Sequence, residues 1–168
     1  SNGDLWLINP NGILFGANSQ VDVHGLLATT GDISNADFLS SNYNFGIPSS
    51  LSSTVINQGS ITAAEGGLVA LIAPGVQNMG IITARLGKVS LASGTTFTVD
   101  LYGDQLINLG VDSNVMGQVM GMDGEVLSSL VTNSGSIFAD GGVVRLDVNA
   151  AKGTVDRVMN MDSVIKAH

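Results

Sequence analysis

Apolar and polar residues alternate along three segments of the chain, and the three segments share one pattern. The segments cover 55–71, 76–91 and 131–146, and each carries Val, Asn, Gly, Ile and Ala at every second residue, followed by Gly, Val and Leu. Residues two apart in an extended strand point to the same face, so this spacing predicts strands rather than helices. The asparagines of the first two copies are 21 residues apart, a period typical of solenoid proteins.

Stacking of these units would allow each short segment to bury its apolar face. Strands about 4.8 Å apart in successive coils bring equivalent residues into rows, so the isoleucines and leucines are expected to share one core. The asparagines suit turn positions held by their side chains, and the glycines suit tight corners or positive φ angles. We therefore predict an all-β parallel β-helix in which the asparagines stack. The rows are Ile61, Ile82 and Ile137; Leu71, Leu91 and Leu146; Asn57, Asn78 and Asn133; and Gly59, Gly80 and Gly135.

Two stretches depart from the repeat within what we expect to be a single β-helix domain covering 1–168. Residues 32–54 are rich in Ser and Asn, and we interpret them as an excursion from the helix. The 55 residues from Asn78 to Asn133 are expected to hold at least one coil and a second excursion near 95–130. Within that region, 97–101 and 106–109 predict two strands joined by a turn at 102–104. Earlier in the chain, 21–28 predicts another pair of strands.

Composition and charge narrow the classes of function. The chain is 44% hydrophobic and only 12% charged, with 22 glycines and no cysteine, which fits neither a helical bundle nor a disordered tail and excludes disulfides. A net charge of −8 would repel phosphate backbones, so nucleic acid is not an expected partner. No apolar run approaches the ~18 residues of a membrane span, so membrane insertion is not expected either.

The search for reactive or metal-binding residues yields no expected catalytic residue, cofactor or metal site. His24 and His168 lie far apart in sequence, and the acidic residues between 100 and 125 lack the spacing of a calcium-binding loop. Arg85 and Asp140 occupy matching outward positions of the repeat and would approach each other on neighbouring coils. They keep one alternative open, a β-helix that binds or cleaves carbohydrate, although an exposed ion pair is the commoner arrangement.

A dense turn signal lies near the start of the chain, where Asn9, Pro10, Asn11 and Gly12 precede Ile13. Proline fixes φ, and Asn and Gly tolerate turn conformations, so these residues predict a corner between two apolar strands. We expect the corner to be structural, with both asparagines bonded to nearby main chain, so that Asn11→Ala would lower stability and secretion together.

The run from Leu7 to Gly16 resembles the hallmark motif of the two-partner-secretion (TPS) domain of filamentous-haemagglutinin-type exoproteins, the TpsA family or haemagglutination activity domain. The resemblance continues through 21–30 and 32–39 and then through the repeats. Family domains carry a stretch before this motif, so the chain is expected to be the larger, C-terminal part of such a domain. Membership implies a right-handed β-helix without enzymatic activity.

The resemblance also implies a role and a set of partners. The expected function is a secretion-recognition and scaffold module of a large exported adhesin-like or haemolysin-like protein, secreted by or displayed on a Gram-negative bacterium after passage through the periplasm. The expected partner is an outer-membrane TpsB transporter with POTRA domains. A receptor on host or neighbouring cells, and self-association through an uncapped N-terminal end, are further expectations.

Overall fold

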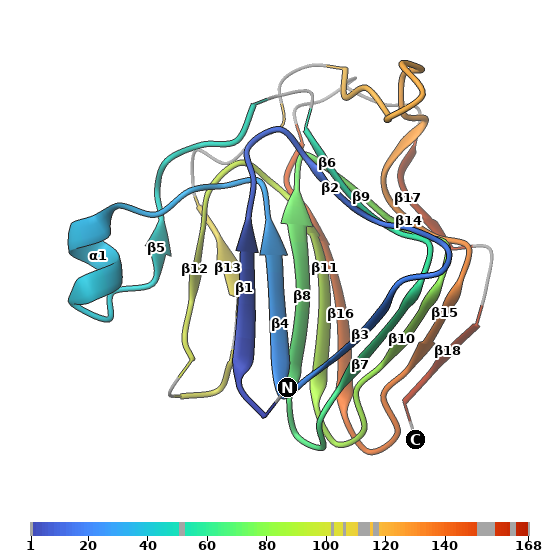
Figure 1. Cartoon of the computed structure of the whole chain (residues 1–168). Coiled ribbons are helices and arrows are strands. Elements are labelled where there is room, and N and C mark those ends of the chain that lie inside the picture. The colour runs from blue at the N-terminus through green and yellow to red at the C-terminus, as the bar shows by residue number, and fades with distance from the viewer. Residues whose placement is uncertain are drawn as a thin grey trace.

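The chain folds into stacked coils, and each coil contributes strands to three parallel sheets (Figure 1). The computed structural model describes residues 2–50, 53–101, 103–105, 107–110, 115, 118–150, 157–161 and 164–167. The first sheet contains, in spatial order, β1 (Asp4–Ile8), β4 (Gly25–Thr29), β8 (Leu68–Ala73), β11 (Lys88–Ser93) and β16 (Val143–Val148). The second contains β2 (Ile13–Phe15), β6 (Thr54–Asn57), β9 (Gly75–Asn78), β14 (Ser129–Asn133) and β17 (Arg157–Met161). The third contains β3 (Gln20–Val23), β7 (Ser60–Ala63), β10 (Ile81–Thr83), β15 (Ser136–Phe138) and β18 (Val164–Lys166).

The register of these strands confirms the repeat and the predicted parallel β-helix. Each repeat supplies one strand to the second, third and first sheets in that order, as β6, β7 and β8 do. Ile82 lies between Ile61 and Ile137 in the third sheet, and the leucines and asparagines of the repeat are paired in the same way. Equivalent residues therefore stack in rows along the coil axis.

Among the described residues, the stretch from Asn78 to Asn133 holds the rest of one coil, with β10 and β11, and then an excursion, which confirms that prediction. β9 pairs directly with β14, β10 with β15 and β11 with β16, so the two repeats are adjacent coils. The described segments between them contribute no strand to the three sheets, although Val115 forms an isolated parallel bridge with Ala150.

Two coils are not visible as repeats in the sequence. β2, β3 and β4 form a coil before the first repeat, in which Phe15 pairs with Asn57 and Gln20 with Ser60. The chain has five steps from Phe15 to Gln20 but only three from Asn57 to Ser60, and this longer corner disrupts the alignment. β17 and β18 belong to a coil that follows the last repeat.

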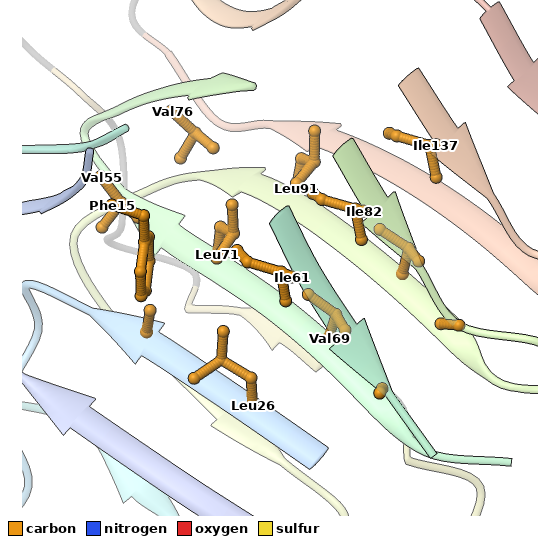
Figure 2. Packing of buried hydrophobic residues seen from close by; sticks show 14 of the residues in the cluster. Phe15, Leu26, Val55, Ile61, Val69, Leu71, Val76, Ile82, Leu91 and Ile137 are labelled. Carbon is orange, nitrogen blue, oxygen red and sulfur yellow. The ribbon is translucent and has the colours of Figure 1, made fainter. Parts of the chain in front are cut away.

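The inward side chains of the coils form a continuous apolar core (Figure 2). Ile61, Ile82, Ile137, Leu71 and Leu91 are each 0% exposed in this core, and Leu146 is partly buried against it. Figure 2 shows Ile61, Ile82 and Ile137 directed into the same interior as Leu71 and Leu91. This arrangement confirms the predicted inward rows.

The two excursions meet on the outside of the first sheet. The first contains α1 (Asn35–Leu39) and β5 (Asn44–Phe45), and the second contains β12 (Phe97–Val99) and β13 (Ile107–Leu109). β12 pairs antiparallel with both β5 and β13, which confirms the predicted strand pair, although residues 102 and 106 lie outside the described part. Phe45 and Phe97 stack with their ring centroids 4.4 Å apart over apolar residues of β4, β8 and β11, forming a second core.

Candidate recognition surface

The turn motif forms the corner between β1 and β2. The Gly12 N–H donates to the Asn9 carbonyl at 3.1 Å, the Asn11 N–H donates to Asn9 Oδ1 at 3.0 Å, and the Asn9 N–H donates to the Thr29 carbonyl of the next coil at 3.0 Å. Gly12 has a φ of 111°, and a Cβ there would lie 3.1 Å from the Thr54 carbonyl oxygen. The corner therefore needs glycine at its last position and is tied to the coil that follows.

The two asparagines of the corner have different roles, which corrects the expectation that both side chains bond the nearby main chain. Asn9 bonds the main chain with its side chain, whereas the Asn11 side chain makes no hydrogen bond within the part of the chain that is described. Asn9, Pro10 and Asn11 are exposed, and Gly12 and Ile13 are partly exposed. Asn9, not Asn11, is thus the side chain on which the turn geometry depends.

The repeat asparagines form a buried ladder rather than a binding surface. Asn57 Nδ2 donates to Asn78 Oδ1 at 2.8 Å, and Asn78 Nδ2 donates to Asn133 Oδ1 at 2.7 Å. All three residues are 0% exposed. Asn57 Oδ1 also accepts the Gly59 N–H at 3.1 Å, so the ladder holds the corner between the second and third sheets.

The repeat glycines are required for space rather than for a positive φ. None of Gly59, Gly80 and Gly135 has a positive φ. A Cβ at Gly80 would lie 2.1 Å from the Gly59 carbonyl oxygen, and one at Gly135 would lie 2.0 Å from the Gly80 carbonyl oxygen. Side chains here would force the coils apart, which explains the row of glycines. A shallow open hollow on the outside of this corner is lined by the glycines and polar neighbours such as Gln20 and Ser60.

Two adjacent apolar residues of the first excursion, Phe38 and Leu39, are highly exposed near β1, the strand that leads into the turn motif. Phe38 is 52% exposed and Leu39 is 83% exposed, and α1 buries none of its residues. Figure 1 shows α1 at the outside of the molecule, beyond β5. Trp6 of β1 contacts Phe38 edge to face, with ring centroids 5.8 Å apart, and anchors the excursion to the first coil. Phe38 and Leu39 lie in 32–39, one of the segments that resemble the family, but nothing in the sequence marked them as exposed.

The helix is held in place by local bonds. The Ser34 side chain caps α1 by accepting the Asp37 N–H, and the Ser34 hydroxyl donates to the Asp37 carboxylate at 2.8 Å. The Asn42 side chain donates to the same carboxylate at 2.7 Å. These contacts fix the direction in which Phe38 and Leu39 point, because α1 has only five residues and would not be stable alone.

The described residues offer no arrangement typical of catalysis or metal binding. Arg85 and Asp140 are both exposed and form no ion pair with each other in the described chain. No group of three or more His, Asp or Glu side chains there could hold a metal ion, and His168 lies outside the described residues. His24 Nδ1 lies 2.7 Å from Asp4 Oδ1 in a half-exposed pair that joins two turns of the coil. No helix in the described residues is long and apolar enough to cross a membrane.

Three parallel sheets wound as stacked coils, with an antiparallel excursion on one face, place the chain in the class of right-handed parallel β-helix proteins. The family model described as the TPS secretion domain matches residues 1–168. The chain therefore belongs to the TPS secretion domain family, whose members are exported by Gram-negative bacteria through the periplasm and are recognised by TpsB transporters.

Two relatives from Haemophilus influenzae are similar to this chain. The crystal structure of the HMW1 secretion domain matches with a TM-score of 0.66 and 27% identity, covering 99% of this chain and 45% of that chain. A Heme/hemopexin-binding protein is 29% identical over 140 residues, which cover 79% of this chain and 15% of the relative. The chain thus spans a small part of this longer relative.

Proposed function

We propose that this chain is the secretion-recognition and scaffold module of a larger exported adhesin-like or haemolysin-like protein, bound in the periplasm by the POTRA domains of its TpsB transporter. The observation that carries this proposal is the match of the TPS family model to all 168 residues.

The last coil supports the scaffold part of the proposal. Val143, Met161, Val164 and Ile165 are between 36% and 54% exposed on β16, β17 and β18. Within the described residues these strands pair on one side only, since each is the last strand of its sheet. Exposed apolar side chains beside unpaired strand edges are a template on which a further parallel coil can stack. The greater length of the haem/hemopexin-binding relative fits such continuation.

We place the transporter contact on α1, at Phe38 and Leu39. Single exposed apolar residues are common on protein surfaces. Here two adjacent ones lie on a capped helix that Trp6 holds against β1. The chain stabilises this short helix without burying either side chain, which favours a role in binding another protein. An apolar anchor of this kind suits a groove between the helices and strands of a partner domain.

The motif corner has a structural role in this account. Asn9 and Gly12 set the turn and bond the neighbouring coil, and Trp6, which anchors α1, lies in the strand just before the corner. Loss of the corner would therefore displace α1 and weaken transporter binding indirectly.

Binding of the chain to the purified POTRA domains of its transporter, measured by biolayer interferometry, tests the proposal. Leu39→Ser should lower the affinity by about tenfold or more, because one buried apolar anchor contributes roughly 1.5–3 kcal/mol. Leu86→Ser is the matched control, since Leu86 is also an exposed leucine (56%) but lies in the turn before β11. Both variants should melt like the parent.

Three outcomes separate the parts of the proposal. Equal affinities for the parent and Leu39→Ser would show that the contact lies elsewhere, and no binding by the folded parent would refute the role itself. For the corner, Asn9→Ala should lower the melting temperature and binding together, whereas Asn11→Ala should change neither. If Asn11→Ala melts like the parent but loses binding, the corner contacts the transporter directly.

A further inference from the structure

A small hollow lies outside the first sheet, under the edge of the antiparallel excursion. Its volume is about 150 Å³, and its apolar walls come from Leu68 of β8, Ile107 of β13 and Val143 of β16. Its polar lining comes from Lys88, Ser90, Gln105 and Arg145. Four separate strands therefore converge on one partly enclosed space.

The first observation that points to a ligand in this hollow is the state of the Ser90 hydroxyl. The residue is only 5% exposed, and its Oγ has no hydrogen-bond partner among the described residues. A buried hydroxyl without a partner is destabilising, and most buried polar groups in proteins are paired. The repeat does not require serine here, since the register partner of Ser90 in β8 is Ala70. A group that enters the hollow would supply the missing partner.

Positive charge gathers at the same place in a chain of net charge −8. Arg145 is the register partner of Ser90 across β11 and β16, and Lys88 lies two residues before Ser90 on the same face. These positions are about 5 Å and about 7 Å from Ser90 along the sheet. Asp147 Oδ2 already lies 2.6 Å from Arg145 Nε, whereas Lys88 has no ion-pair partner within the described residues. The ammonium group of Lys88 is therefore available to an anion.

We propose that this hollow binds a small monocarboxylate with a compact apolar body. The carboxylate would accept hydrogen bonds from the Ser90 hydroxyl and the Lys88 ammonium, with Arg145 adding positive charge, and charge-assisted bonds of this kind are the stronger ones. The apolar body would pack against Leu68, Ile107 and Val143. A cavity of about 150 Å³ accommodates one six-membered ring. This ligand is independent of the transporter contact, since α1 contributes no residue to the hollow.

Titration of the ¹⁵N-labelled chain with benzoate, followed by NMR, tests the proposal. Benzoate should shift the amide signals of Ser90 and Arg145 saturably. Its neutral analogue benzamide should bind with an affinity lower by about tenfold or more. Lys88→Met should weaken benzoate binding by a similar factor, and Ser90→Ala should weaken it without lowering the melting temperature. Arg85→Met removes an exposed cation that does not line the hollow and should have no effect.

Each remaining outcome counts against the proposal. Equal affinities for benzoate and benzamide would refute carboxylate recognition, and the absence of saturable shifts would show that water alone fills the space. Stronger binding of glucuronate than of benzoate would refute the apolar body and indicate an acidic sugar instead. If Lys88→Met does not fold, the comparison of Ser90→Ala with the parent decides the question.

Discussion

The asparagine ladder makes a quantitative prediction about stability. Asn78 is the middle member, and it accepts a hydrogen bond from Asn57 and donates one to Asn133, with all three residues fully buried. Asn78→Ala removes both bonds and leaves the Asn57 amide N–H and the Asn133 amide oxygen without that partner. A buried polar group that loses its partner costs about 1–3 kcal/mol. The free energy of unfolding should therefore fall by about 2–6 kcal/mol, a large share of the ~5–15 kcal/mol typical of a domain.

Urea denaturation followed by circular dichroism measures this change. Gln77→Ala is the matched control, because Gln77 is the neighbouring residue of β9, points away from the core and is partly exposed. It should change the free energy of unfolding by no more than about 1 kcal/mol. A double-mutant cycle with Asn57→Ala should give a coupling of about 0.5–3 kcal/mol, since the two side chains are directly bonded.

A small effect of Asn78→Ala on the free energy of unfolding would refute the stabilising role of the asparagine ladder. If Asn78→Ala unfolds within about 0.5 kcal/mol of the parent at an unchanged m-value, the buried amides find other partners and the ladder does not stabilise the coil stack.

Three further predictions concern the core, the corners and the coil edges. Ile82→Ala should lower the free energy of unfolding by about 2–5 kcal/mol, and a smaller loss in urea denaturation would mean that the central row is loosely packed. Gly80→Ala should destabilise by more than about 4 kcal/mol in the same assay, because its Cβ would overlap the preceding coil, whereas Gly16→Ala, with open space around it, should be tolerated. This chain should self-associate through β1, β2 and β3, which pair on one side only within the described residues, and light scattering measures this. Leu14→Lys should reduce the association more than Met79→Lys, although both residues are 44% exposed. A parent that stays monomeric at high concentration would contradict the last prediction.

The sequence predicted the fold wherever equivalent residues keep the same spacing. Val, Asn, Ile and Leu of the repeats identified the rows that the strand register confirms, because inward positions of a coil must be apolar or mutually bonded. The coil of β2, β3 and β4 was predicted only as separate strands and not as a repeat, because Phe15 stands where the repeats have asparagine and the corner after it is longer.

The candidate surfaces were much less predictable than the core. The pairing of β5 with β12 joins residues that are 52 apart in sequence, Phe45 and Phe97, and no local pattern links them. The exposure of Leu39 follows from where that small sheet positions α1. The different roles of Asn9 and Asn11 depend on which side-chain oxygen reaches a main-chain N–H, and residue type alone does not decide this. The hollow at Ser90 likewise requires the position of the excursion over the first sheet.

Transporter-dependent export of the chain is the most direct test of the account. The chain, carrying an added export signal, is expressed in a Gram-negative host with and without its TpsB transporter, and the amounts in the periplasm and the medium are compared. We predict that the parent and Leu86→Ser reach the medium only when the transporter is present, and that Leu39→Ser stays in the periplasm as a folded protein. Equal amounts of the parent in the medium with and without the transporter would contradict the proposal that this chain is a secretion-recognition module.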